Sequence, residues 1–308
     1  MNLLTIIMPV FLVIGLGYAL RRFRFIEEEA NAWLSRLVFY VAAPALLFRS
    51  TAQSSFDWGT SAPTLALIGG LTTAAGIVLY LAARGVAPAR RGVLVQGALR
   101  SNTVFVGLPV VLNAYGESAL ALASLLIAFM VVFENFLAVI VLTVPHRERS
   151  ALDPRLWMHT AMRVLRNPLI IGCAGGLLYG ITGLELPATL DRSLALVGSI
   201  AAPLGLLCVG AELDLRKLQA EIPGTALAAV IKLIAYPALV YGGLRLLGLE
   251  GLALEVPVLI MACPTAVVSY IMAREMAGDE RFGAAIVIGT TTAALITLVL
   301  WLAVLTLG

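Results

Sequence analysis

Long apolar stretches dominate this 308-residue chain and restrict the folds that it can adopt. Hydrophobic residues make up 60% of the chain and charged residues only 13%, whereas about 25% of the residues of a typical soluble domain are charged. The stretches are continuously apolar, and their length is close to the roughly 20 residues that a transmembrane helix needs. Strands of a membrane barrel instead alternate apolar and polar residues over about 10 residues. The sequence therefore predicts an all-α membrane protein. The ten predicted spans are residues 3–20, 33–49, 63–83, 92–115, 118–144, 168–183, 189–211, 223–247, 252–275 and 282–307.

Prolines recur at a nearly constant offset between the two halves of the chain. Four pairs are separated by 155 to 160 residues, about half the chain length: Pro9–Pro168, Pro44–Pro203, Pro63–Pro223 and Pro109–Pro264. Self-similarity at a fixed offset is the signature of an internal repeat. We therefore predict two five-helix repeats, at residues 1–144 and 168–308, joined by a linker at 145–167.

Basic residues are distributed unequally between the loops on the two sides of the predicted membrane. Fifteen lie in the loops of one side, and three lie on the other, namely Arg49, Arg192 and Arg245. Cytoplasmic loops carry the excess of Lys and Arg, so we expect linker 145–167 in the cytoplasm and both termini outside it. Because five is an odd number, the second repeat would be inverted relative to the first, as in alternating-access carriers.

The fourth and ninth predicted spans each combine a proline with polar residues, and we expect the helices to break at Pro109 and Pro264. Proline removes a backbone donor, and polar groups freed in lipid need a partner. Breaks at matching places in both halves would offer backbone groups to an ion or a substrate. Plain kinks that aid packing are the alternative. The predicted substrate site consists of Asn102, Gly107, Leu108, Pro109, Pro264, Thr265 and Ser269.

Three ionisable residues, Arg100, Glu134 and Lys232, lie inside predicted spans at similar depth. Charges in a membrane are costly and point to function by default. Two interpretations stay open. Glu134 could pair with Lys232 or Arg100 and serve only stability, or the cations could attract a carboxylate while Glu134 carries a coupling proton. In the last span, Thr291 is a further candidate for the site.

The same segments resemble the auxin efflux carrier family. Residues 101–116 are similar to the fourth span of that family, and residues 264–275 are similar to its ninth. Residues 8–18 and 38–44 resemble its first and second spans, so the resemblance covers the whole chain. The family includes plant auxin transporters and bacterial permeases assigned to malonate and similar acids.

The resemblance implies a fold similar to that of the bile acid–sodium symporters, with two inverted repeats and broken spans four and nine that cross. It also implies a scaffold of spans 1, 2, 6 and 7, a transport domain of the other spans that moves like an elevator, and a homodimer. The chain departs from the plant members in its short linker 145–167 and in Ser269, which replaces a second proline. The second departure disfavours auxin as the substrate.

The sequence thus predicts a secondary carrier of a small organic anion in a bacterial inner membrane, with the lipid bilayer and a second copy of the chain as partners. The alternative is a receptor that binds a lipid or metabolite without transporting it. We expect no enzyme, because the HExxH, Walker and GxSxG signatures are absent. No cofactor, metal or nucleic-acid partner is expected. Substrate, direction and coupling ion stay open.

Overall fold

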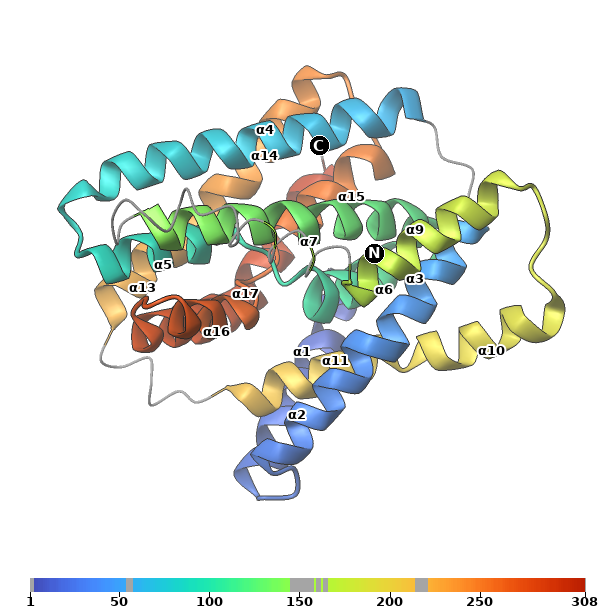
Figure 1. Cartoon of the computed structure of the whole chain (residues 1–308), viewed down its shortest axis with the longest axis horizontal. Coiled ribbons are helices and arrows are strands. Elements are labelled where there is room, and N and C mark those ends of the chain that lie inside the picture. The colour runs from blue at the N-terminus through green and yellow to red at the C-terminus, as the bar shows by residue number, and fades with distance from the viewer. Residues whose placement is uncertain are drawn as a thin grey trace. The chain divides into compact units, whose positions relative to one another are not determined.

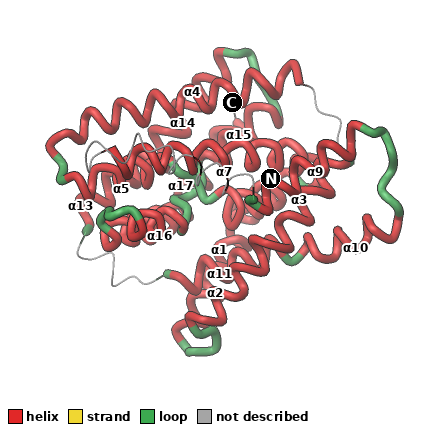
Figure 2. The backbone as a smooth tube through the Cα atoms, in the orientation of Figure 1, coloured by secondary structure: helices red, strands yellow, loops and turns green. Residues whose placement is uncertain are grey.

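The computed structural model describes residues 3–53, 58–144, 158, 162, 166–213 and 221–307. All named elements in these residues are helical, and none is a strand (Figure 2). The predicted all-α class is thus confirmed. Within the same residues, six helices are long and apolar enough to cross a membrane, and each coincides with one predicted span. They are Glu28–Ala52, Gly59–Gly85, Glu117–Thr143, Ala188–Glu212, Ile222–Leu246 and Glu280–Thr306.

The other four predicted spans take two forms. α1 (Leu3–Arg22) and α9 (Pro168–Ile181) are single helices. The fourth and ninth predicted spans are each divided. They form the pairs α5 (Pro88–Leu99) with α6 (Leu108–Tyr115), and α15 (Leu252–Met261) with α16 (Val268–Glu275). The divided span therefore occupies the same place, fourth of five, in both halves of the chain. That all ten spans cross the membrane and that the repeats are inverted stay predictions.

The chain forms two compact units, and each contains parts of both predicted repeats. Unit 1 comprises Met1–Gly59, Thr103–Phe129 and Leu165–Leu213, and unit 2 comprises Thr60–Asn102, Met130–Val164 and Asp214–Gly308. These units do not correspond to the predicted sequence repeats at 1–144 and 168–308, and the division into repeats stays a prediction. Most of linker 145–167 lies outside the described residues.

The helices divide between the units as follows. Unit 1 holds α1, α2 (Glu28–Leu37), α3 (Ala43–Ala52), α6, the first part of α7 (Leu120–Thr143), α9, α10 (Ala188–Ser199) and α11 (Ala201–Glu212). Unit 2 holds most of α4 (Trp58–Ala82), α5, the rest of α7, α13 (Ile222–Val230), α14 (Tyr236–Leu246), α15, α16 and α17 (Glu280–Leu307).

Three short π-helical turns precede prolines. They are η1 (Val38–Ala42), η3 (Thr103–Gly107) and η6 (Ile231–Ala235), and the second residue of the following α-helix is Pro44, Pro109 or Pro237, respectively. In an α-helix, a proline ring clashes with the carbonyl of the residue four positions earlier. Here that residue is the middle one of each π-turn. A π-turn widens the helix at that point and so makes room for the ring.

The π-turns correct one prediction from the sequence. Pro109 follows η3 within helical backbone, because Gly107, the N-cap of α6 two residues before Pro109, has α-helical angles. The expectation that the fourth span breaks at Pro109 is therefore wrong. After η6, the carbonyl of Leu233 accepts a hydrogen bond from the indole of Trp301 at 2.8 Å, in place of the donor that Pro237 lacks.

Glycines allow α1 and α11 of unit 1 to pack closely (Figure 1). A Cβ atom added at Gly17 would meet the backbone carbonyl of Leu207, and one added at Gly210 would meet the carbonyl of Ile14. Small residues permit the same close backbone approach between helices in membranes. The contact is made by backbone atoms, which cannot move aside as the end of a flexible side chain can.

Gly17→Ala is accordingly expected to destabilise the protein, since overpacking costs about 1–3 kcal/mol. Gly15→Ala on the same helix is the matched control, because its Cβ would meet nothing within 4 Å and alanine favours a helix over glycine by about 1 kcal/mol. Thermal unfolding of the two variants in detergent should give a lower Tm only for Gly17→Ala. Equal melting of both would contradict the close contact.

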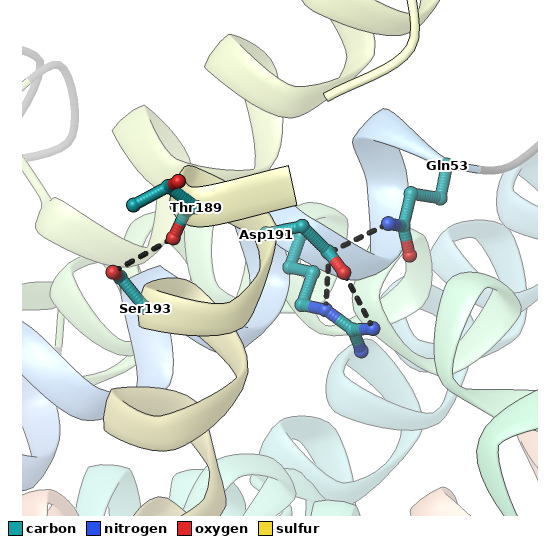
Figure 3. A network of polar contacts seen from close by, with 5 residues as sticks. Gln53, Thr189, Asp191 and Ser193 are labelled. Carbon is teal, nitrogen blue, oxygen red and sulfur yellow. Dashed lines mark hydrogen bonds and ion pairs between the residues drawn. The ribbon is translucent and has the colours of Figure 1, made fainter. Parts of the chain in front are cut away.

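A polar cluster joins α3 and α10 within unit 1 (Figure 3). Asp191 accepts hydrogen bonds from Arg49 Nε at 2.7 Å and from Gln53 Nε2 at 2.7 Å. Arg49 Nη2 reaches the second carboxylate oxygen at 3.4 Å. The side chains of Arg49 and Asp191 are 21% and 26% exposed, and pairs near solvent contribute at most about 1 kcal/mol. The cluster thus orients the two helices more than it stabilises them.

Candidate functional site

The two interrupted segments meet inside unit 2 and are hydrogen-bonded to each other. Asn102 N donates to Pro264 O at 2.7 Å, and Ala266 N donates to Arg100 O at 3.3 Å. The first interruption therefore lies at residues 100–102, directly after α5, and the second lies at 262–267, between α15 and α16. This short antiparallel contact is buried, as Asn102 is only 3% exposed.

Side chains replace hydrogen bonds that α5 and α15 lose at their ends. Ser101 N donates to Glu134 Oε1 at 3.1 Å instead of continuing the helix, and Gly97 O accepts from Thr265 Oγ1 at 2.6 Å. Thr265 N in turn donates to Thr290 Oγ1 at 3.1 Å. Because lipid offers no hydrogen bonds, such groups must be satisfied within the protein. Glu134, Thr265 and Thr290 therefore stabilise the interruptions.

Two buried cations lie at the C-terminal ends of the interrupted helices. Lys232 Nζ donates to Met261 O at 2.6 Å and to Ser101 Oγ at 2.8 Å, and Met261 is the last residue of α15. Arg100, the C-cap of α5, donates to Asn135 Oδ1 at 2.9 Å. A helix C-terminus carries partial negative charge, which favours a cation there.

Glu134 lies near both cations without pairing directly with either. Among the described residues, no nitrogen of Arg100 or Lys232 comes within 4.0 Å of its carboxylate, which instead accepts from Ser101 N. Arg100 and Lys232 act on Glu134 through their charges over longer distances. The direct pair that one interpretation of the sequence assumed is thus absent here, and Ser101 is hydrogen-bonded to both Glu134 and Lys232.

The predicted substrate residues divide between the two units. The interruptions of unit 2 contain Asn102, Pro264 and Thr265, and Ser269 lies beside the second one in α16. In η3 and the first turn of α6, buried within unit 1, lie Gly107, Leu108 and Pro109. The charged candidates Arg100, Glu134 and Lys232 all belong to unit 2.

Two buried polar atoms beside the second interruption lack hydrogen-bond partners within the described residues. They are Ser269 Oγ and Gln96 Oε1, and Gln96 Nε2 donates to Ser269 O at 2.8 Å. Ser269 is the second residue of α16, and the partial positive charge at a helix N-terminus suits an anion. In the described part of the chain, no group of three or more His, Cys, Asp or Glu could hold a metal ion.

Ser101 and Thr290 were not among the site residues predicted from the sequence, although both stabilise the interruptions. Thr291 was a candidate instead, but its hydroxyl donates within its own helix to Val287 O. Neighbouring helical positions differ by about 100°, so a run of threonines does not reveal which one faces a partner. A buried lysine such as Lys232 needs hydrogen-bond acceptors. This need could have indicated the hydroxyl of Ser101, which directly precedes the predicted site residue Asn102.

Together, the apolar helices and the paired interruptions define a polytopic membrane protein of the transporter type. Residues 3–302 match the sequence model of the membrane transport protein family. The chain therefore belongs to this family, that of the auxin efflux carriers, and the resemblance noted from the sequence is confirmed.

Three relatives match almost the full length of the chain. An uncharacterized transporter of Methanothermobacter thermautotrophicus is 26% identical over 311 residues, covering 97% of each chain. A protein of Rhizobium meliloti, provisionally named a malonate transporter, is 26% identical over 300 residues, or 92% of this chain and 90% of its own. An uncharacterized transporter of Methanocaldococcus jannaschii is 24% identical over 308 residues, covering 97% of each.

Proposed function

We propose that this protein is a secondary active transporter that moves a small organic anion across the membrane by alternating access. The observation that carries the proposal is the pair of buried, hydrogen-bonded interruptions in unit 2. Discontinuous helices of this kind form substrate and ion sites in many secondary transporters. Family membership supports transport, and the provisional name of the Rhizobium meliloti relative supports a carboxylate as substrate.

Asn102 and Ser269 are the proposed anion contacts. The Asn102 amide can donate to a carboxylate, and Ser269 adds a buried hydroxyl at the positive end of α16. Arg100 and Lys232 already donate to protein acceptors, so we assign them charge support and not direct contact. Gly107, Leu108 and Pro109 of unit 1 remain candidates on sequence grounds alone.

The division into two compact units suits an elevator-type motion. Predicted spans 1, 2, 6 and 7 fall in unit 1, spans 3, 8, 9 and 10 fall in unit 2, and spans 4 and 5 are divided after residues 102 and 129. We propose unit 2 as the moving part, because it contains both interruptions. We further propose that the protein is a homodimer in a bacterial inner membrane, that both of its termini lie outside the cytoplasm, and that it is not an enzyme.

A ligand-stabilisation screen tests the substrate class. The purified protein is melted with a panel of mono- and dicarboxylates that includes malonate, with and without sodium, and with amines of similar size as controls. At least one carboxylate is expected to raise the Tm, because a ligand at 100 times its Kd adds about 2.7 kcal/mol to stability. Stabilisation by lipids or amines but by no carboxylate would contradict the proposal.

A further inference from the structure

We propose that the ammonium group of Lys232 permanently occupies a monovalent-cation site between the ends of α5 and α15, so that this protein needs no sodium ion there. The consequence for transport rests on the proposed function, whereas the consequence for stability does not. All residues involved belong to unit 2.

The groups that surround the ammonium are those of a cation site. Its two hydrogen-bond acceptors are Met261 O, at 2.6 Å, and Ser101 Oγ, at 2.8 Å. The carboxylate of Glu134 is bonded to the main chain of the same Ser101 and attracts the ammonium through its charge. Hard cations in proteins take carbonyl, hydroxyl and carboxylate oxygens, and unwound carbonyls at half-helix ends coordinate sodium in transporters.

The charges of the two helix C-termini and of the buried side chains balance when this position holds a cation. Each helix C-terminus carries roughly half a negative charge, so the ends of α5 and α15 together contribute about one. An ionised Glu134 contributes a second, and Arg100 and Lys232 supply two positive charges. Since Lys232 is 0% exposed, water cannot compensate for its loss, and its removal would leave about one buried negative charge without a partner.

The lysine is held at its backbone and at its ammonium group, as expected of a fixed group. It lies in η6, and its Nζ is 5.2 Å from the centre of the Tyr236 ring, within range of a cation–π interaction. The Tyr236 hydroxyl forms hydrogen bonds with Thr72 Oγ1 at 2.7 Å and Met261 Sδ at 3.3 Å. The ammonium is thus tethered to unit 2 and cannot be released as a free ion can.

Lys232→Ala should convert the position into a site for a free cation. In N-methylglucamine chloride, the purified variant should melt below wild type. Sodium chloride at equal ionic strength should raise its Tm by about 2–5 °C, and n-propylammonium, which replaces the atoms removed, should do the same. The wild-type Tm should be equal in sodium and N-methylglucamine chloride.

Lys232→Met is the matched control, because it removes the charge but fills the space. It should melt below wild type and gain nothing from sodium or propylammonium. Wild type stabilised specifically by sodium, or Lys232→Ala with one Tm in all three salts, would overturn the proposal. A Lys232→Ala protein that folds only with sodium or propylammonium supports it, and one that folds with none of the cations contradicts it.

Uptake into proteoliposomes separates this inference from the proposed function. Wild-type uptake of the carboxylate found in the screen should be the same with and without a sodium gradient, whereas Lys232→Ala should transport only with sodium. If neither protein transports a carboxylate but sodium still restores the Tm of the variant, the proposed function fails and the cation site stands.

Discussion

Replacing Asn102 with alanine is expected to weaken substrate binding about tenfold to a hundredfold while the protein stays folded. The main chain holds this residue in place, through the hydrogen bond from its N to Pro264 O at 2.7 Å, and alanine retains that bond. A hydrogen bond to a charged group contributes about 1.5–3 kcal/mol, which corresponds to this loss of affinity. Asn102→Asp should bind more weakly still, because it adds a like charge. Calorimetric titration measures both.

Asn31→Ala is the matched control for Asn102. Asn31 is also a buried amide, 5% exposed, and donates to Cys208 O at 3.4 Å, but it lies in unit 1 and in neither interrupted segment. Its replacement should lower the Tm and leave the affinity unchanged. Wild-type affinity in folded Asn102→Ala protein would remove Asn102 from the site, and a similar loss in both variants would show that affinity merely follows stability.

Glu134→Ala is expected to lower the free energy of unfolding by about 3–5 kcal/mol, as when one member of a buried charged group is removed. The change deprives the buried Ser101 N of its acceptor and leaves Arg100 and Lys232 without the nearby negative charge. Glu134→Gln keeps an oxygen that can accept from Ser101 N, so its loss should be smaller. Thermal unfolding should rank wild type above Glu134→Gln, and Glu134→Gln above Glu134→Ala.

The Glu134→Gln variant also separates the two roles that the sequence left open. A carrier of the coupling proton would lose uptake driven by a pH gradient yet retain exchange of labelled for unlabelled substrate. A purely structural carboxylate would leave the pH dependence of uptake unchanged while the Tm falls. Because Glu134 is bonded to the backbone of the first interruption, we expect the second outcome, and selective loss of pH-driven uptake would contradict it.

The sequence predicted which two segments are interrupted but not where the first interruption lies. Pro264 falls inside the second interruption, as predicted. Pro109 does not mark the first, because η3 accommodates its ring and the extended backbone falls at residues 100–102 instead. A proline in a sequence is compatible with a kink, a π-turn or a break, and only the packing around it selects one of them.

The hydrogen-bond partners of the buried charged residues could not be predicted from the sequence either. The similar depth of Arg100, Glu134 and Lys232 made them candidates for one site, and the structure places all three in unit 2. Two of their actual partners are backbone groups, namely Ser101 N for Glu134 and Met261 O for Lys232. Backbone groups become available as partners only where a helix ends. The pattern of side chains in the sequence did not indicate the residues at which α5 and α15 end.

Exchange of labelled for unlabelled carboxylate across proteoliposome membranes tests the central claim most directly. Vesicles that contain the wild-type protein and are loaded with the carboxylate found in the screen should accumulate the labelled compound from outside. Excess unlabelled carboxylate should abolish this uptake, and Asn102→Ala should reduce it at least tenfold below saturation. Specific binding of the carboxylate without any exchange would contradict the transporter and favour a receptor.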